Sequence, residues 1–148
     1  MNLKGCVTMY KNILLPYDFG NSFSNVPDQL KKLVGDNPDH TITIFNIITE
    51  SEHANSVRYE GKHFDTLVEE RKEFLKPFTD QLDELDLNYQ IQFESGLIKR
   101  TLLKEINTND YDVVVMSNKR SKRDIKHVLG HVTHKIAKRV NTPVVIVK

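Results

Sequence analysis

Cysteine is almost absent from this sequence, and the features of secreted and membrane-spanning chains are missing. The single cysteine, Cys6, cannot form an internal disulfide or a CxxC metal site, which favours a reducing compartment. No apolar run is long enough to span a bilayer, and Met1–Tyr10 lack the charged-then-apolar layout of a secretory signal. We therefore expect a cytoplasmic protein that does not enter a membrane.

Motifs for the common catalytic and metal chemistries are also missing. The sequence contains no P-loop, no Gly-x-Ser-x-Gly elbow and no His-Glu-x-x-His pair. His127, His131 and His134 have a helical spacing, but Gly130 interrupts that face and no acid or cysteine completes a zinc site. We expect neither an enzyme active site nor a bound metal.

The charges that are present are unevenly distributed. The net charge of the 148 residues is +1, yet residues 117–139 carry eight Lys or Arg residues and one acid, Asp124. This segment has a charge of +7 and the remainder a charge of −6. Such a basic segment attracts anions, although a solvated loop and helix face would explain the same composition. Both interpretations stay open.

Short apolar segments alternate with amphipathic ones along the chain. Five are rich in β-branched and apolar residues and are predicted to be strands: 12–17, 41–48, 89–94, 112–116 and 143–147. Four carry apolar residues at helical spacing, within 23–34, 64–85, 98–106 and 132–140. Pro77 is expected to kink or split the second helix. Residues 49–62 are polar and lack periodicity, so we expect an exposed loop there.

Strands that alternate with helices indicate a parallel sheet that is covered on both faces. We therefore predict a single α/β domain, a doubly wound sandwich with a five-stranded, mainly parallel sheet. Ligands of such sheets bind beyond the carboxyl ends of the strands, at the point where the strand order reverses. In this sequence those ends lie at Tyr17–Asp18, Asn46–Ile47 and Met116–Ser117.

The order of elements and several short stretches resemble the universal stress protein family. The stretches are Ile13–Asp18, Gly96 with the helix after it, Asp110–Met116, Gly130–Ile136 and Asn141–Val147. The resemblance covers residues 10–148 and implies the fold called adenine nucleotide alpha hydrolase-like. It leaves residues 1–9 as an N-terminal extension, which we expect to be flexible.

Nucleotide-binding members of this family carry Gly-x2-Gly-x9-Gly-[Ser/Thr] before the last helix. Glycines there let the backbone approach phosphates. This sequence keeps the spacing but has Ser117, Arg120, Gly130 and His131 at the four positions, with a hydroxyl at Thr133. Loss of two glycines argues against the usual pose of ATP. The added cations suit phosphate or another anion, so an adenine nucleotide such as ATP stays a candidate ligand.

The resemblance also implies a set of binding residues. It places Asp18 against the base and ribose of a nucleotide, where a carboxylate accepts hydrogen bonds. Asp18 could equally cap the loop that follows it. Further members of the set are Pro16, Ile47 and Met116 around the base, with Val132 and Thr133 near the phosphates.

The function that the resemblance implies is a cytoplasmic stress-response binding or regulatory protein. We expect a homodimer that forms through the last strand, Val144–Val147, whose edge would otherwise be exposed. One alternative is an ATP-binding sensor or weak ATPase. Another is an interaction module whose basic stretch, Lys119–Lys126, meets an acidic or anionic partner. Nucleic acid is not expected, because few aromatic residues accompany the charges.

Overall fold

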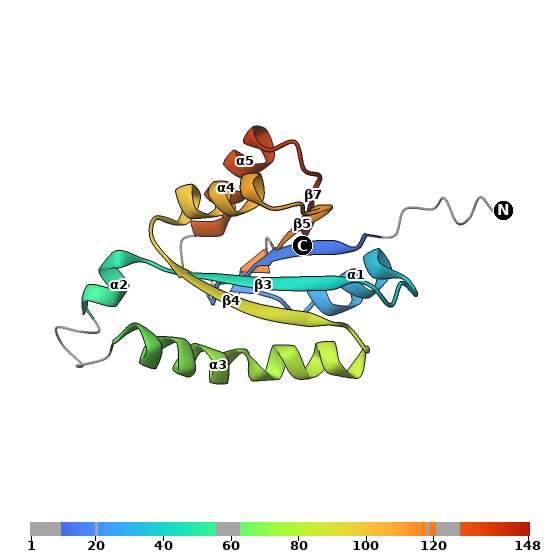
Figure 1. The fold of residues 1–148 in the computed structure, drawn as a ribbon, viewed down its shortest axis with the longest axis horizontal. Coiled ribbons are helices and arrows are strands. Elements are labelled where there is room, and N and C mark those ends of the chain that lie inside the picture. Colours follow the sequence, from blue (N-terminus) through green and yellow to red (C-terminus); the bar gives the residue numbers. More distant parts are fainter. Residues whose placement is uncertain (1–9, 20, 56–62, 118, 121–127) are drawn as a thin grey trace.

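The chain forms a central sheet whose five strands all run parallel (Figure 1). The computed structural model describes residues 10–19, 21–55, 63–117, 119–120 and 128–148, with the backbone alone at 119–120 and 128–131. The predicted five-stranded sheet is confirmed. Its strands, in the order β4-β3-β1-β5-β7, are β4 (Tyr89–Ser95), β3 (Thr41–Ile48), β1 (Asn12–Pro16), β5 (Val113–Ser117) and β7 (Val144–Val147).

Burial explains why these segments form strands in this order. The central strands β1 and β5 consist mainly of apolar residues, and all their residues except Asn12 are buried, as strands covered on both faces must be. The strand β4 lies at one edge and alternates polar with apolar side chains, so it is only half-buried. The strand β7 forms the other edge, and its residue Ile146 is 43% exposed.

Helices cover both faces of the sheet, as predicted. On one face, α1 (Val26–Val34) and α3 (Phe64–Glu84) pack against the side chains of Ile13, Ile44 and Val113. On the other face, α4 (Ile98–Thr108) and α5 (Val128–Arg139) pack against Leu14, Phe45 and Val114. Figure 1 shows α4 and α5 on one side of the sheet and α3 on the opposite side.

The structure differs from the elements predicted from the sequence at three places. Residues 49–62 were expected to form a loop, but they contain a helix, α2 (Glu50–Asn55). The helix α3 is not split at Pro77, since Leu75 before it and Leu82 after it are both anchored in one core cluster. A second, two-stranded antiparallel sheet joins β2 (Asn21–Ser22) to β6 (Lys119–Arg120).

The helix α2 begins with a capping box. The Thr49 hydroxyl accepts from the Glu52 N–H at 3.2 Å, and the Glu52 carboxylate accepts from the Thr49 N–H at 3.2 Å. This reciprocal pair satisfies backbone donors that a helix start leaves unpaired, and its Thr-x-x-Glu pattern is visible in the sequence. The loop prediction was wrong because it relied on the lack of apolar periodicity in residues 49–62, whereas the helix begins at a capping pattern.

The order of strands reverses beside β1. From β1 the chain adds β3 and then β4 on one side, and it afterwards adds β5 and β7 on the other side. The carboxyl ends of β1, β3 and β5 therefore meet at one edge of the sheet, at the topological switch point.

Candidate functional site

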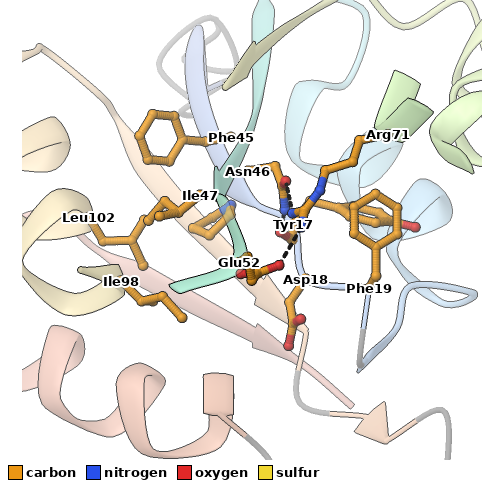
Figure 2. A pocket seen from close by; sticks show the side chains of 11 residues that line it. Tyr17, Asp18, Phe19, Phe45, Asn46, Ile47, Glu52, Arg71, Ile98 and Leu102 are labelled. Carbon is orange, nitrogen blue, oxygen red and sulfur yellow. Dashed lines mark hydrogen bonds and ion pairs between the residues drawn. The ribbon is translucent and has the colours of Figure 1, made fainter. Parts of the chain in front are cut away.

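A pocket opens at the carboxyl ends of β1 and β3 (Figure 2). Its volume is about 140 Å³, less than the ~300 Å³ at which sites for drug-sized ligands begin. The enclosed part therefore suits a small planar group better than a complete nucleotide. The lining residues are Pro16, Tyr17, Asp18, Phe19, Phe45, Asn46, Ile47, Glu52, Arg71, Ile98 and Leu102.

One wall of the pocket is apolar. Phe45 and Ile47 come from the end of β3, and Ile98 and Leu102 come from the first turns of α4. Figure 2 shows these side chains gathered on one side, facing the polar residues on the other. An apolar wall of this kind offers contact area to a flat ligand but no hydrogen bond, so any orientation of the ligand depends on the opposite wall.

The opposite wall is a hydrogen-bonded network around Asn46, whose side chain is only 4% exposed. The Asn46 amide donates to the carbonyl of Tyr17 at 2.8 Å, and its Oδ1 accepts from Arg71 at 2.7 Å. Arg71 also forms an ion pair with Glu52. The network thereby connects the end of β1, the end of β3, α2 and α3.

Glu52 is held in its charged form by this network. Burial of the carboxyl acts to raise its pKa, but hydrogen bonds from Thr49 and Arg71 and the charge of Arg71 outweigh burial and lower the pKa of Glu52. An ionised carboxylate accepts hydrogen bonds and donates none.

Aromatic contacts fix the chain that leaves β1. The Tyr17 ring stacks on Phe23 with 4.1 Å between ring centroids and also contacts Phe78 at 5.2 Å. Burial, together with the charge of Asp18, raises the pKa of the Tyr17 phenol, so it stays neutral. The Arg71 guanidinium lies 5.7 Å from the centroid of the Phe19 ring. Tyr17 and Phe19 thus anchor the segment that presents Asp18.

Asp18 lies at the pocket and contacts the next strand. Its Oδ2 accepts from the side-chain amide of Asn21 at 2.9 Å, and its carbonyl accepts from the Asn21 N–H at 3.2 Å. The buried Asn21 Oδ1 has no hydrogen-bond partner among the residues that the structure describes. The Asp18 carboxylate thus contacts the following turn through the Asn21 side chain, while Asp18 also lines the pocket.

Some of the predicted binding residues line the pocket, and others lie elsewhere in the structure. Pro16, Asp18 and Ile47 line the pocket. Met116 and Val132 belong instead to the core between the sheet and the helices α4 and α5. Ser117, at the end of β5, is buried and donates to the carbonyl of Ser22 at 2.5 Å, and Thr133 is buried in α5.

The remaining predicted positions are described by their backbone only. Arg120 is part of β6, where it pairs with Asn21, and Gly130 and His131 are in the first turn of α5. Most of the basic stretch Lys119–Lys126 lies outside the described residues. The phosphate side of the expected site therefore stays a prediction.

Two charged pocket residues, Glu52 and Arg71, are absent from the set predicted from the sequence. Glu52 carries a recognisable signal, because it is the last residue of the Thr-x-x-Glu capping pattern. Arg71 carries none, since it is one of several charged residues in an amphipathic helix and meets Asn46 only through packing of α3 on the sheet.

The model of the universal stress protein family matches residues 9–148. The chain belongs to that family. Comparison of this universal stress protein with curated protein sequences found no significant match.

Solved structures confirm the universal stress protein fold. The hypothetical protein MJ0577 is 24% identical, with a TM-score of 0.74 and with 95% of this chain and 97% of that chain covered. Universal stress protein UspA from Lactobacillus plantarum is 12% identical, with a TM-score of 0.71 and coverage of 95% and 99%. A universal stress protein solved in complex with cAMP is 16% identical, with a TM-score of 0.60 and coverage of 95% and 98%.

Among the described residues there is no group of three or more His, Cys, Asp or Glu side chains that could hold a metal ion. In the same part of the chain, no helix is both long and apolar enough to cross a membrane.

Proposed function

We propose that this universal stress protein is a regulatory binding protein for an adenine nucleotide, whose base occupies the pocket at the ends of β1 and β3. The observation that carries the proposal is the position and form of the pocket. It lies beside the switch point of a parallel sheet, and an apolar wall faces the carboxylates of Asp18 and Glu52. The relative in complex with cAMP supports the same ligand class.

In this proposal the parts of the nucleotide have different environments. The base lies against Ile47, Ile98 and Leu102, and Asp18 accepts hydrogen bonds from ribose hydroxyls. The phosphates extend beyond the pocket, because its volume of about 140 Å³ leaves no room for them. They point toward the segment that contains Ser117, Arg120 and the start of α5, where helix N–H groups favour anions. ATP is one such ligand, and an adenine nucleotide with fewer phosphates is another.

The proposed role is binding in the cytoplasm and not catalysis. An adenine nucleotide that binds the folded state stabilises the protein by mass action, which would make the bound form longer-lived under stress. A weak ATPase is a less favoured alternative, because Arg120 and His131 replace residues that the family uses around the phosphates.

Calorimetric titration with AMP and with ATP plus magnesium tests the proposal. We expect binding that weakens at least roughly tenfold in Asp18→Ala, because a charged hydrogen-bond acceptor is lost. Asp28→Ala, which removes an exposed acid from α1, is the matched control and should bind as the wild type does. Absence of heat at millimolar nucleotide, with no nucleotide released from freshly purified protein in mass spectrometry, would refute the proposal.

The proposed assembly is a homodimer through β7. This strand forms an edge of the sheet and has an exposed apolar side chain, Ile146, so a second copy could add to the sheet and cover it. Val145→Pro should yield monomers in sedimentation, whereas Gln90→Lys, on the opposite edge strand β4, should leave the dimer intact. An unchanged dimer in Val145→Pro would exclude this interface.

A second candidate function is an interaction module for an acidic or anionic partner. Packing of α4 on α5 brings Lys99 near Lys135 and Arg139, and the neighbouring ammonium group of Lys135, together with the charge of Arg139, lowers the pKa of Lys99. No ion pair among the described residues neutralises these three cations, in contrast to Lys72 and Lys76 on α3. Binding to an anionic polymer should then weaken steeply with salt and further in Lys135→Gln. Salt-independent binding would contradict this candidate.

A further inference from the structure

In the polar wall of the pocket, neighbouring residues engage both the nitrogen and the oxygen of the Asn46 side chain. Asn46 is buried, its amide donates to the Tyr17 carbonyl and its Oδ1 accepts from Arg71. Arg71 is itself 17% exposed and divides its contacts among Asn46, Glu52 and the ring of Phe19. Asn46 and Arg71 are therefore engaged mainly in holding the wall together.

Glu52 is the charged member of that network with capacity left for a ligand. A carboxylate offers about four lone-pair positions. One oxygen accepts from the Thr49 N–H and, at 2.9 Å, from its hydroxyl, and the other oxygen accepts from Arg71. The second oxygen retains acceptor capacity, and the side chain is 45% exposed at the pocket. Figure 2 shows Glu52 between Arg71 and Asp18.

Arg71 fixes the Glu52 side chain from outside α2, and α2 also contacts α3 through the ring of His53, whose centroid lies 5.9 Å from that of Phe64. No residue of α2 is buried, so the helix lacks an apolar anchor in the core. Thr49 closes the capping box within the helix, while Arg71 ties Glu52 to α3 and, through Asn46, to the end of β3. A guanidinium suits this task, since its planar fork can donate to two partners at fixed angles.

We propose that Glu52, positioned by Arg71, is a specificity-determining residue that favours a heterocycle with an amino group over one with an oxo group. The inference rests on the proposed function and identifies the residue that selects the base. An amino N–H of the ligand can donate to the free capacity of the carboxylate. An oxo oxygen at the same place is an acceptor, as the carboxylate oxygen is. The two oxygens then repel each other, and neither receives a hydrogen bond.

Titration of the full-length protein with three 5′-monophosphates tests this selection. The ligands carry adenine, hypoxanthine, which has an oxo group in place of the amino group, and unsubstituted purine. We expect the wild type to prefer adenine over hypoxanthine by roughly tenfold or more, with purine between them. In Glu52→Gln the preference should shrink to within about threefold, because a carboxamide can present either a donor or an acceptor. Glu50→Gln, two residues away and exposed on the same helix, should keep the wild-type ratio.

Arg71→Lys separates positioning from folding. A lysine keeps the positive charge but loses the planar fork, so the adenine-to-hypoxanthine ratio should fall while far-UV circular dichroism still shows the native fold. Equal affinity for the two bases in the wild type would overturn the inference and leave the proposed function standing. The same conclusion would follow from an unchanged preference in Glu52→Gln. If none of the three ligands binds, the proposed function fails and the inference fails with it.

Discussion

Replacing Asn46 with alanine tests the network that shapes the pocket. The side chain is 4% exposed and makes two hydrogen bonds, one to the Tyr17 carbonyl at 2.8 Å and one from Arg71 at 2.7 Å. A neutral hydrogen bond contributes about 1 kcal/mol and one to a charged group about 1.5–3 kcal/mol. Asn46→Ala loses both bonds and leaves the Tyr17 carbonyl and the Arg71 guanidinium each without one partner in a partly buried wall. The free energy of unfolding should therefore fall by roughly 2–4 kcal/mol.

Urea denaturation followed by circular dichroism measures this change. The midpoint should fall while the slope of free energy against urea stays constant, because the surface exposed on unfolding barely changes. For a chain of this size the thermal midpoint should fall by roughly 4–16 °C. Asn109→Ala is the matched control: its exposed amide donates to the Glu105 carbonyl at 3.0 Å, and its loss should cost under about 1 kcal/mol.

A loss below about 1 kcal/mol in Asn46→Ala would refute the reasoning, since it would place Asn46 among ordinary surface hydrogen bonds. If Asn46→Ala loses this much stability but nucleotide raises its denaturation midpoint as much as that of the wild type, the link between this network and the pocket is refuted. Both outcomes can be read from the same samples, because a ligand that binds only the folded state shifts the denaturation midpoint.

Two further predictions concern Glu52 and Gly96. The pKa of Glu52 is lowered from its ordinary value of 4.5, so its contribution to stability is present above that pH and is lost as the pH falls through the lowered pKa. The difference in thermal midpoint between the wild type and Glu52→Gln should therefore be constant from pH 7 to about 5 and shrink below about pH 4; a difference that grows in acid would contradict this. Gly96 has a φ of +145°, and a Cβ there would lie 2.6 Å from the Thr101 Oγ1, so Gly96→Ala should destabilise the protein by roughly 1–3 kcal/mol in urea denaturation. Thr101→Ala combined with Gly96→Ala should recover only the steric part of that loss, and full recovery would show that backbone strain is unimportant.

The fold was predictable because its signals are local. The run Val113–Met116 is apolar throughout, which only a strand covered on both faces tolerates, and the alternation in Tyr89–Glu94 indicates the half-exposed edge strand that β4 proves to be. The short elements were harder to predict from the sequence. The helix α2 depends on a single capping pattern, and the two-residue strands β2 and β6 have no periodicity at all.

The candidate site was predictable only in part. Asp18 and Ile47 follow from the rule that ligands bind at the carboxyl ends of parallel strands, and both line the pocket. Met116 stands at a similar strand end and shares a core cluster with the pocket residues Phe45 and Ile47, yet it is completely buried beneath α4 and α5 and does not line the pocket. Strand ends identify the edge of the sheet, whereas the packing of the helices decides which side chains at that edge stay open to a ligand.

By itself the sequence determined the alternation of strands and helices, the parallel sheet that follows from it, and the edge where a ligand would bind. Each of these depends on apolar periodicity, which can be recognised within a stretch of a few residues. Only the tertiary structure decided the polar chemistry at that edge. Asn46, Glu52 and Arg71 come from three elements and meet because α3 packs across β3, and hydrogen bonds between residues 25 and 19 positions apart leave no mark on the local pattern.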